Sequence, residues 1–226
     1  MIQLAFDTAT DVCTVALRVG NREWTDHRVD PRAHAQLLLP MIDGVTTSAG
    51  VALADIEVLV YGRGPGSFTG VRIAVAAAQG LSLSTQARTV GVSTLGALAQ
   101  ATHMLTGAID IVAALDARMS EIYLGHYRVD EVSGVVCLQG VEQVCAPDTL
   151  SGFDASCTFA GPGAERYADA VSGPVTTNVL PTASAMLNLA SPSIEHGELQ
   201  APGEATPVYL RDKVALTEVE RAAGKT

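Results

Sequence analysis

A run of glycines stands between a strand-like segment and a helix-like segment in the first third of the chain. The run is Gly62-Arg63-Gly64-Pro65-Gly66-Ser67-Phe68-Thr69-Gly70, and it follows the apolar residues 56–61. Backbone N–H groups and the helix dipole in such a turn can face a phosphate. The run lacks the Gly-Lys-Ser/Thr of a Walker A loop, and its glycine spacing differs from that of a dinucleotide fingerprint. A tight turn that lets the following helix pack on the sheet is the alternative interpretation.

Two further clusters combine acidic residues with groups that bind ligands. Asp7-Thr8-Ala9-Thr10 follows the strand-like residues 2–6, and an Asp in that place can hold a metal-bound phosphate. The alternative is an Asx turn between two strands. Asp116 and Arg118 lie between two later strand-like segments, where they either orient a ligand or form a salt-bridged turn.

The histidines and cysteines show no spacing that is typical of a metal site. The five histidines form neither HxxxH nor HExxH, and His34, which precedes an apolar helix, is expected to be partly exposed. The four cysteines have no CxxC spacing, so we expect no zinc and reduced core thiols, as in a cytoplasmic protein. The cysteines are Cys13, Cys137, Cys145 and Cys157.

Hydrophobic periodicity predicts alternating strands and helices, hence an α/β fold. Strands are expected at 2–6, 13–19, 23–29, 56–61, 90–92, 109–115, 122–128 and 135–144. Helices are expected around 37–45, with Pro40 as a kink or start, at 71–83, from Ser93 or Thr94 to 105, and at 182–189. The sequence after Pro192 is expected to be irregular, with mobile last residues. We place a boundary near 106, which gives two subdomains, 1–106 and 107–226.

The composition excludes several classes of protein. The 226 residues are 48% hydrophobic and carry a formal net charge of −10, with a pI of about 4.8. This apolar content excludes general disorder, and the acidic balance argues against a large nucleic-acid surface. No apolar run approaches the roughly 20 residues of a membrane span. No basic residue precedes Arg18, so a signal peptide is not expected.

Six segments, in their order along the chain, resemble the TsaB (YeaZ) family of bacterial threonylcarbamoyladenosine biosynthesis. The Gly64-Pro65-Gly66-Ser67-Phe68-Thr69-Gly70 segment is the most specific of them. The others begin at Phe6, Arg32, Gly91, Asp116 and Pro207, so that the resemblance spans roughly residues 2–211. It implies an actin-like, Hsp70-like ATPase (ASKHA) fold with two RNase H-like subdomains, and common descent with the catalytic protein TsaD.

The resemblance also implies that the ancestral sites are degraded. The two metal-binding histidines of the TsaD-like pattern align with Thr94 and Leu98, which cannot replace imidazoles on a divalent metal. A Ser-Gly-Gly-His turn of TsaD-like proteins aligns with residues 115–118 of this chain. The loop that holds adenine in proteins of this fold aligns with residues 161–164. We therefore expect no catalytic residue and no metal. The residues expected to bind a nucleotide weakly, if one binds, are Asp7, Thr8, Gly64, Gly66, Ser67, Thr69 and Gly70.

The implied function is that of a noncatalytic partner of TsaD in the modification of tRNAs that read ANN codons. TsaE is a second expected partner, tRNA is contacted indirectly, and the protein alone forms a homodimer. No cofactor is required, although ATP or ADP can lie at a subunit interface. A free-standing ATP-dependent transferase or kinase and a metallopeptidase-like enzyme are the alternatives. The residues expected to face the partner are Leu38, Met41, Ile42, Val71, Ala74, Ala77 and Ala78.

Overall fold

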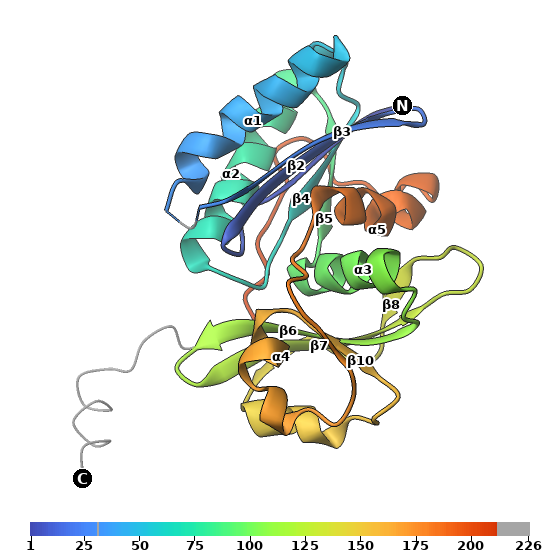
Figure 1. The fold of residues 1–226 in the computed structure, drawn as a ribbon. Helices are drawn as coiled ribbons and strands as arrows, with labels where there is room; N and C mark the ends of the chain where they lie inside the picture. Colours follow the sequence, from blue (N-terminus) through green and yellow to red (C-terminus); the bar gives the residue numbers. More distant parts are fainter. Residues whose placement is uncertain (31, 212–226) are drawn as a thin grey trace, which may run out of the picture.

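The computed structural model describes residues 1–30 and 32–211, which form two β-sheets with helices packed against them (Figure 1). The first sheet has the strand order β3-β2-β1-β4-β5. Strands β1, β2 and β3 pair antiparallel, whereas β4 and β5 are parallel to β1. Parallel strands need long crossovers, and helices provide them here. The five strands are β1 (Ile2–Asp7), β2 (Val12–Val19), β3 (Arg22–Val29), β4 (Val58–Gly62) and β5 (Arg88–Val92).

The second sheet has the order β11-β10-β6-β7-β8, and β9 also pairs with β7. The prediction of one strand over 135–144 is wrong. Gly140 adopts a left-handed φ of 84° and interrupts the segment, so that two short strands pair with opposite ends of β7. The strands are β6 (Asp110–Arg118), β7 (Glu121–Val129), β8 (Val136–Leu138), β9 (Gln143–Cys145), β10 (Thr158–Ala160) and β11 (Val175–Thr176).

Helices α1 (His34–Ala49) and α2 (Phe68–Thr85) cover one face of the first sheet. Helices α3 (Thr94–Thr106) and α5 (Ala183–Glu195) lie between the two sheets (Figure 1). Helix α5 packs on the first sheet although it comes late in the chain. Because α5 follows residue 106 in the chain and yet packs on the first sheet, the boundary near residue 106 stays a prediction. The short helices are η1 (Leu53–Asp55), η2 (Pro147–Gly152), α4 (Pro162–Arg166) and η3 (Ala168–Ala170).

Two helix ends test the expectations from the sequence. Ser93 caps α3, because its hydroxyl accepts a hydrogen bond from the Gly96 N–H at 3.2 Å. The expected irregular segment after Pro192 is wrong in its first residues, since α5 continues to Glu195. Proline removes one helix hydrogen bond, but the buried Ile194 holds the last turn against the core. The expected mobile tail falls on residues 212–226, outside the described part.

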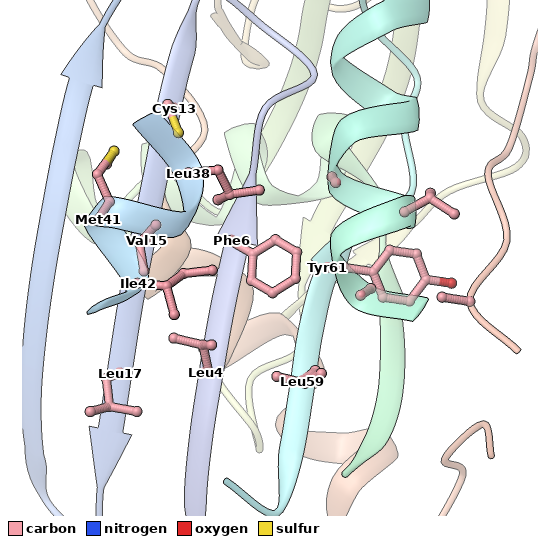
Figure 2. Close-up of a cluster of buried hydrophobic side chains, with 14 of the residues drawn as sticks. Leu4, Phe6, Cys13, Val15, Leu17, Leu38, Met41, Ile42, Leu59 and Tyr61 are labelled. Carbon is pink, nitrogen blue, oxygen red and sulfur yellow. The ribbon is translucent and has the colours of Figure 1, made fainter. Parts of the chain in front are cut away.

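The core over the first sheet explains why α1 and α2 form where they do. The apolar residues of α1 recur at helical spacing and pack on Leu4, Phe6 and Val15 of the sheet (Figure 2). Pro40 lies inside α1, on its exposed side. Among the described residues, no helix is both long and apolar enough to cross a bilayer.

This packing corrects the predicted partner-facing residues. Six of the seven side chains are at most 2% exposed and belong to the core, whereas Ala77 is partly buried. Helical periodicity identifies the face that meets the protein's own sheet, and the sequence alone does not distinguish this face from a docking face. The six buried residues are Leu38, Met41, Ile42, Val71, Ala74 and Ala78.

The cysteines are less uniform than the expected set of core thiols. All four are free in the structure; Cys13 and Cys157 are buried, Cys145 is half-buried and Cys137 is exposed. Burial, with a smaller effect of the Asp7 carboxylate, raises the pKa of Cys13 to about 12. That thiol is therefore inert at neutral pH.

Two neighbouring leucines of α1 give a direct test of the core assignment. Leu38 is 2% exposed and Leu39 is 56% exposed. We expect Leu38→Ala to lower the free energy of unfolding by about 2–4 kcal/mol, because it leaves a cavity. Leu39→Ala is expected to change it by less than about 0.5 kcal/mol. Urea denaturation of both variants measures the difference, and equal losses would contradict the assignment.

Candidate functional site

A cleft of about 440 Å³ opens between the ends of the two sheets. One wall consists of the turn at 9–11 and the loop at 65–68, which belong to the first sheet and the start of α2. The opposite wall comes from residues 115–119, where β6 turns into β7. Residues 208–211 also line the cleft, together with Val71, Tyr123, Pro162 and Leu180. The cleft thus lies beside the glycine run that the sequence analysis selected.

The glycines of this run let α2 begin against the turn after β1. A Cβ atom on Gly70 would lie 1.9 Å from the Thr8 carbonyl oxygen, and one on Gly66 would lie 2.3 Å from that of Ala9. The Ser67 N–H donates to the Ala9 carbonyl at 2.7 Å, and the Thr8 hydroxyl donates to the Gly70 carbonyl at 2.7 Å. These contacts support the interpretation of the run as a tight packing turn.

Asp7 is held inside the first sheet and does not face the cleft. Its carboxylate accepts hydrogen bonds from the Ala9 N–H at 2.7 Å and from the Thr94 hydroxyl at 3.0 Å. The first of these bonds is the Asx turn that the sequence allowed. A Cβ on Gly62 would lie 2.3 Å from the Asp7 carboxyl carbon, so this buried position depends on glycine there. His34 is also 5% exposed, which corrects the expectation of a partly exposed side chain.

The structure divides the seven residues predicted to bind a nucleotide. Asp7, Thr8, Gly64 and Gly70 are buried and do not line the cleft, so a nucleotide held in the cleft would not contact these four directly. Their polar groups and backbone are used in packing the turn on the loop. Two others, Gly66 and Ser67, line the cleft, and Thr69 is exposed beside it. For these three, nucleotide binding stays a prediction.

The two positions that align with metal-binding histidines have structural roles. Thr94 is fully buried and donates its hydroxyl proton to Asp7. Leu98 is also fully buried and belongs to the core between α3 and the second sheet. A Cβ on Gly161 would lie 2.4 Å from a methyl carbon of Leu98, so the leucine packs against the turn that aligns with an adenine loop. Both positions therefore contribute to the fold.

The Asp116 cluster forms a salt-bridged turn, which is the second of the two interpretations offered by the sequence. The Asp116 carboxylate lies 3.0 Å from Arg166 and 3.6 Å from Arg118, and it accepts the Arg118 backbone N–H at 2.8 Å. Residues 118–120 all have left-handed φ values between 53° and 63°. The turn therefore places a carboxylate, already paired with arginine, on one wall of the cleft.

The last described residues, for which the sequence predicts no role, connect the two walls of the cleft. The Val208 N–H donates to the Arg63 carbonyl at 2.7 Å on the first-sheet side. The Arg211 guanidinium donates to the Ala117 carbonyl at 3.0 Å and pairs with Glu121 on the other side. The segment from Pro207 to Arg211 was part of the resemblance, but nothing in its pattern shows what it contacts.

A group of aromatic and basic side chains at the mouth of the cleft was also missed. The Arg72 guanidinium lies 3.7 Å from the centre of the Phe68 ring, and its Nε lies 3.1 Å from the Tyr209 hydroxyl. The Phe68 and Tyr209 rings are 5.8 Å apart. This cluster fixes the segment around Tyr209 on the first turn of α2.

The buried Asp7 gives a pH-dependent test. Burial raises the pKa of this carboxyl above its ordinary value, and the hydrogen bonds from Ala9 and Thr94 offset only part of the effect. The protonated form therefore favours folding at low pH, and this stabilisation is lost as the pH rises through the folded-state pKa. We expect Asp7→Asn, which keeps a hydrogen-bonding amide, to gain stability relative to the parent chain as the pH rises from the acidic range to neutrality. Urea unfolding across this range measures the gain, and a loss that grows with pH would contradict it.

Comparison with known proteins gives consistent matches over most of the chain. The family model TsaD, described as tRNA N6-adenosine threonylcarbamoyltransferase, matches residues 28–190. The tRNA threonylcarbamoyladenosine biosynthesis protein TsaB of Escherichia coli is 40% identical, over 94% of this chain and 95% of the relative. The protein of the same name from Haemophilus influenzae is 33% identical, over 93% and 94% of the two chains.

A solved structure supports the fold independently of these names. The YeaZ structure from Pseudomonas aeruginosa superposes with a TM-score of 0.87 at 39% identity, and covers 92% of this chain and 99% of that one. The actin-like α/β fold with RNase H-like sheets is therefore confirmed. The full-length relatives, the family model and the solved structure all lead to the same conclusion. The chain belongs to the TsaB (YeaZ) family of tRNA threonylcarbamoyladenosine biosynthesis proteins.

Proposed function

We propose that this chain is a noncatalytic subunit that binds a TsaD-type catalytic subunit and supports threonylcarbamoyladenosine formation on tRNA. Two lines of evidence support the pathway: the names of the full-length relatives, and the match of residues 28–190 to the TsaD family model. A chain that is related to the catalytic protein but lacks its chemistry suits a supporting subunit. The free-standing transferase and the metallopeptidase are not favoured.

The proposal of a noncatalytic role rests on the packing of Thr94 and Leu98. Each side chain is fully buried, and each contributes to the fold through a hydrogen bond or an apolar contact. Replacing them with ligands would require both to leave the core. A hydroxyl and an alkyl group also lack the basicity of the imidazoles that bind divalent metals. The same region that holds a metal in the related enzyme therefore serves stability here.

The exposed side of α1 and α2 is the surface best suited to a partner helix pair. We define the outer helix surface by Leu39, Phe68, Ala76, Gly80 and Leu83. The leucines are 56% and 57% exposed, Phe68 is 44% exposed, and Ala76 and Gly80 are exposed as well. Small residues allow helix axes to approach closely, and the exposed leucines supply apolar area. This surface replaces the buried residues that the sequence predicted.

The same surface accounts for the other expected partners. Two copies of the chain can pair through it about a two-fold axis, which would give the proposed homodimer when the catalytic subunit is absent. The net charge of −10 leaves tRNA binding mainly to other subunits. A second partner, TsaE, and an ATP or ADP molecule at the subunit boundary are part of the proposal, and the pathway would place the complex in the cytoplasm.

The proposal predicts a stoichiometric complex with the TsaD subunit of the same organism. Titration calorimetry should detect this complex, and Leu83→Glu should weaken it at least about tenfold, because a charge would be buried against apolar residues. Leu105→Glu is the matched control: Leu105 is 68% exposed in the last turn of α3, away from the outer helix surface.

The outcomes separate the function from the surface. If the parent chain does not bind the TsaD subunit, the proposed function is wrong. If it binds and Leu83→Glu binds equally well, the partner role stands and the outer helix surface is wrong. Circular dichroism of both variants controls for folding, which we expect to be unchanged at these exposed positions.

A further inference from the structure

Three neighbouring strands of the second sheet bring different metal-binding groups together at one end of the sheet. Asp110 begins β6, His126 lies on β7, and Cys157 immediately precedes β10. In the strand register Val112 faces His126 and Ile111 faces Thr158, so the three side chains lie on the same face as the core residues Val112 and Phe159. The cluster therefore results from regular strand pairing.

The distances between the three groups are close to those of a metal site. The His126 Nε2 lies 2.5 Å from the Asp110 Oδ1, and the Cys157 Sγ lies 3.6 Å from the same oxygen. All three ligand atoms lie within 4.8 Å of one another. On a tetrahedral zinc ion, a carboxylate oxygen would lie about 3.3 Å from an imidazole nitrogen and about 3.5 Å from a thiolate sulfur. The Asp110–His126 pair has to open by less than about 1 Å, and the His126–Cys157 pair, which is within 4.8 Å, has to lie about 3.5 Å apart.

The surroundings favour a cation and leave room for a fourth ligand. The Asp110 carboxylate lies 3.6 Å from the Cys157 sulfur and places negative charge inside the cluster. The side chains of His126 and Asp110 are 29% and 31% exposed, so water can reach the cluster. The Phe153 ring packs edge-on against His126 at 5.4 Å and holds the imidazole in place.

We propose that Asp110, His126 and Cys157 bind one divalent transition-metal ion, with zinc as the preferred ion and water as the fourth ligand. Nitrogen, oxygen and sulfur donors together suit zinc better than magnesium or calcium, which take oxygen ligands. Zinc binds the thiolate form of cysteine, so binding releases the thiol proton of Cys157. The site is distinct from the cleft: Asp110 and Asp116 are at opposite ends of β6, about 20 Å apart along the strand.

The site would join three strands and the segment around Phe153 into one unit. An ion that binds the folded chain and not the unfolded chain stabilises it by mass action. We therefore expect a structural role in the second sheet, independent of the proposed partner function. Zinc should raise the melting temperature of the full chain, and magnesium at the same concentration should not.

The test is a titration of the full reduced chain with zinc chloride, followed by calorimetry. We expect one equivalent to bind with micromolar or tighter affinity. Cys157→Ala should weaken binding by at least about tenfold, as loss of a ligand should. Cys137→Ala is the matched control, because this exposed thiol lies on β8 outside the cluster.

Cobalt gives a second readout on the unaltered chain, so that the result does not depend on the folding of a variant. Cobalt(II) bound through Cys157 should show a thiolate-to-metal charge-transfer band that zinc displaces. The absence of one-equivalent zinc binding by the parent chain would overturn the proposal. Zinc binding that Cys157→Ala leaves unchanged, or a cobalt complex without a thiolate band, would overturn it equally.

Discussion

The contact between the turn after β1 and the start of α2 is the constraint on which the rest of the structure depends. The backbone of the glycine run approaches this turn so closely that a Cβ on Gly70 would lie 1.9 Å from the Thr8 carbonyl oxygen. The Thr8 hydroxyl and the Ser67 N–H are both used in hydrogen bonds across this contact. A loop that resembles a phosphate cradle in sequence therefore works as a packing surface. It seats α2 on the first sheet and leaves the outer side of that helix exposed.

Behind this contact, side chains at positions that could otherwise take part in catalysis are used to hold the fold together. Asp7 is 2% exposed and its carboxylate is bonded to Thr94, the first residue of α3. Leu98, one turn later, fills the space beside Gly161. Each of these residues links two elements of the fold. Reintroducing metal ligands at Thr94 and Leu98 would thus disturb the core as well as add chemistry, which is consistent with a subunit that acts through binding.

Most of the fold was predictable from the sequence, because strand alternation and helical spacing are local properties. The central strands and the helices α1, α2 and α3 were predicted within a few residues, and the actin-like fold followed from the family resemblance. The misses have long-range causes. The packing of α5 on the first sheet depends on residues far away in the chain. The left-handed φ of Gly140 is a local feature, but the division of this segment into two strands also depends on how β7 pairs with each of them.

The candidate site was predictable only in part, for the same reason. The glycine run marks the loop beside the cleft already in the sequence. Only the packing of Gly66 and Gly70 on the turn after β1 shows what this loop does. The apolar residues of α1 and α2 were assigned to a partner, although they face the protein's own sheet. Residues 208–211 belong to a segment of the family resemblance, but their pattern does not show that they join the two walls of the cleft.

The central claim is that this chain supports threonylcarbamoyladenosine formation without performing the chemistry. The most direct measurement is a reconstitution with purified TsaD, TsaE, this chain, threonylcarbamoyl-AMP and tRNA, in which each component is omitted in turn. Mass spectrometry of the digested tRNA quantifies the modified nucleoside. The account predicts formation with all components, a loss when this chain is omitted, and none when TsaD is omitted. Turnover by this chain in the absence of TsaD would contradict the account.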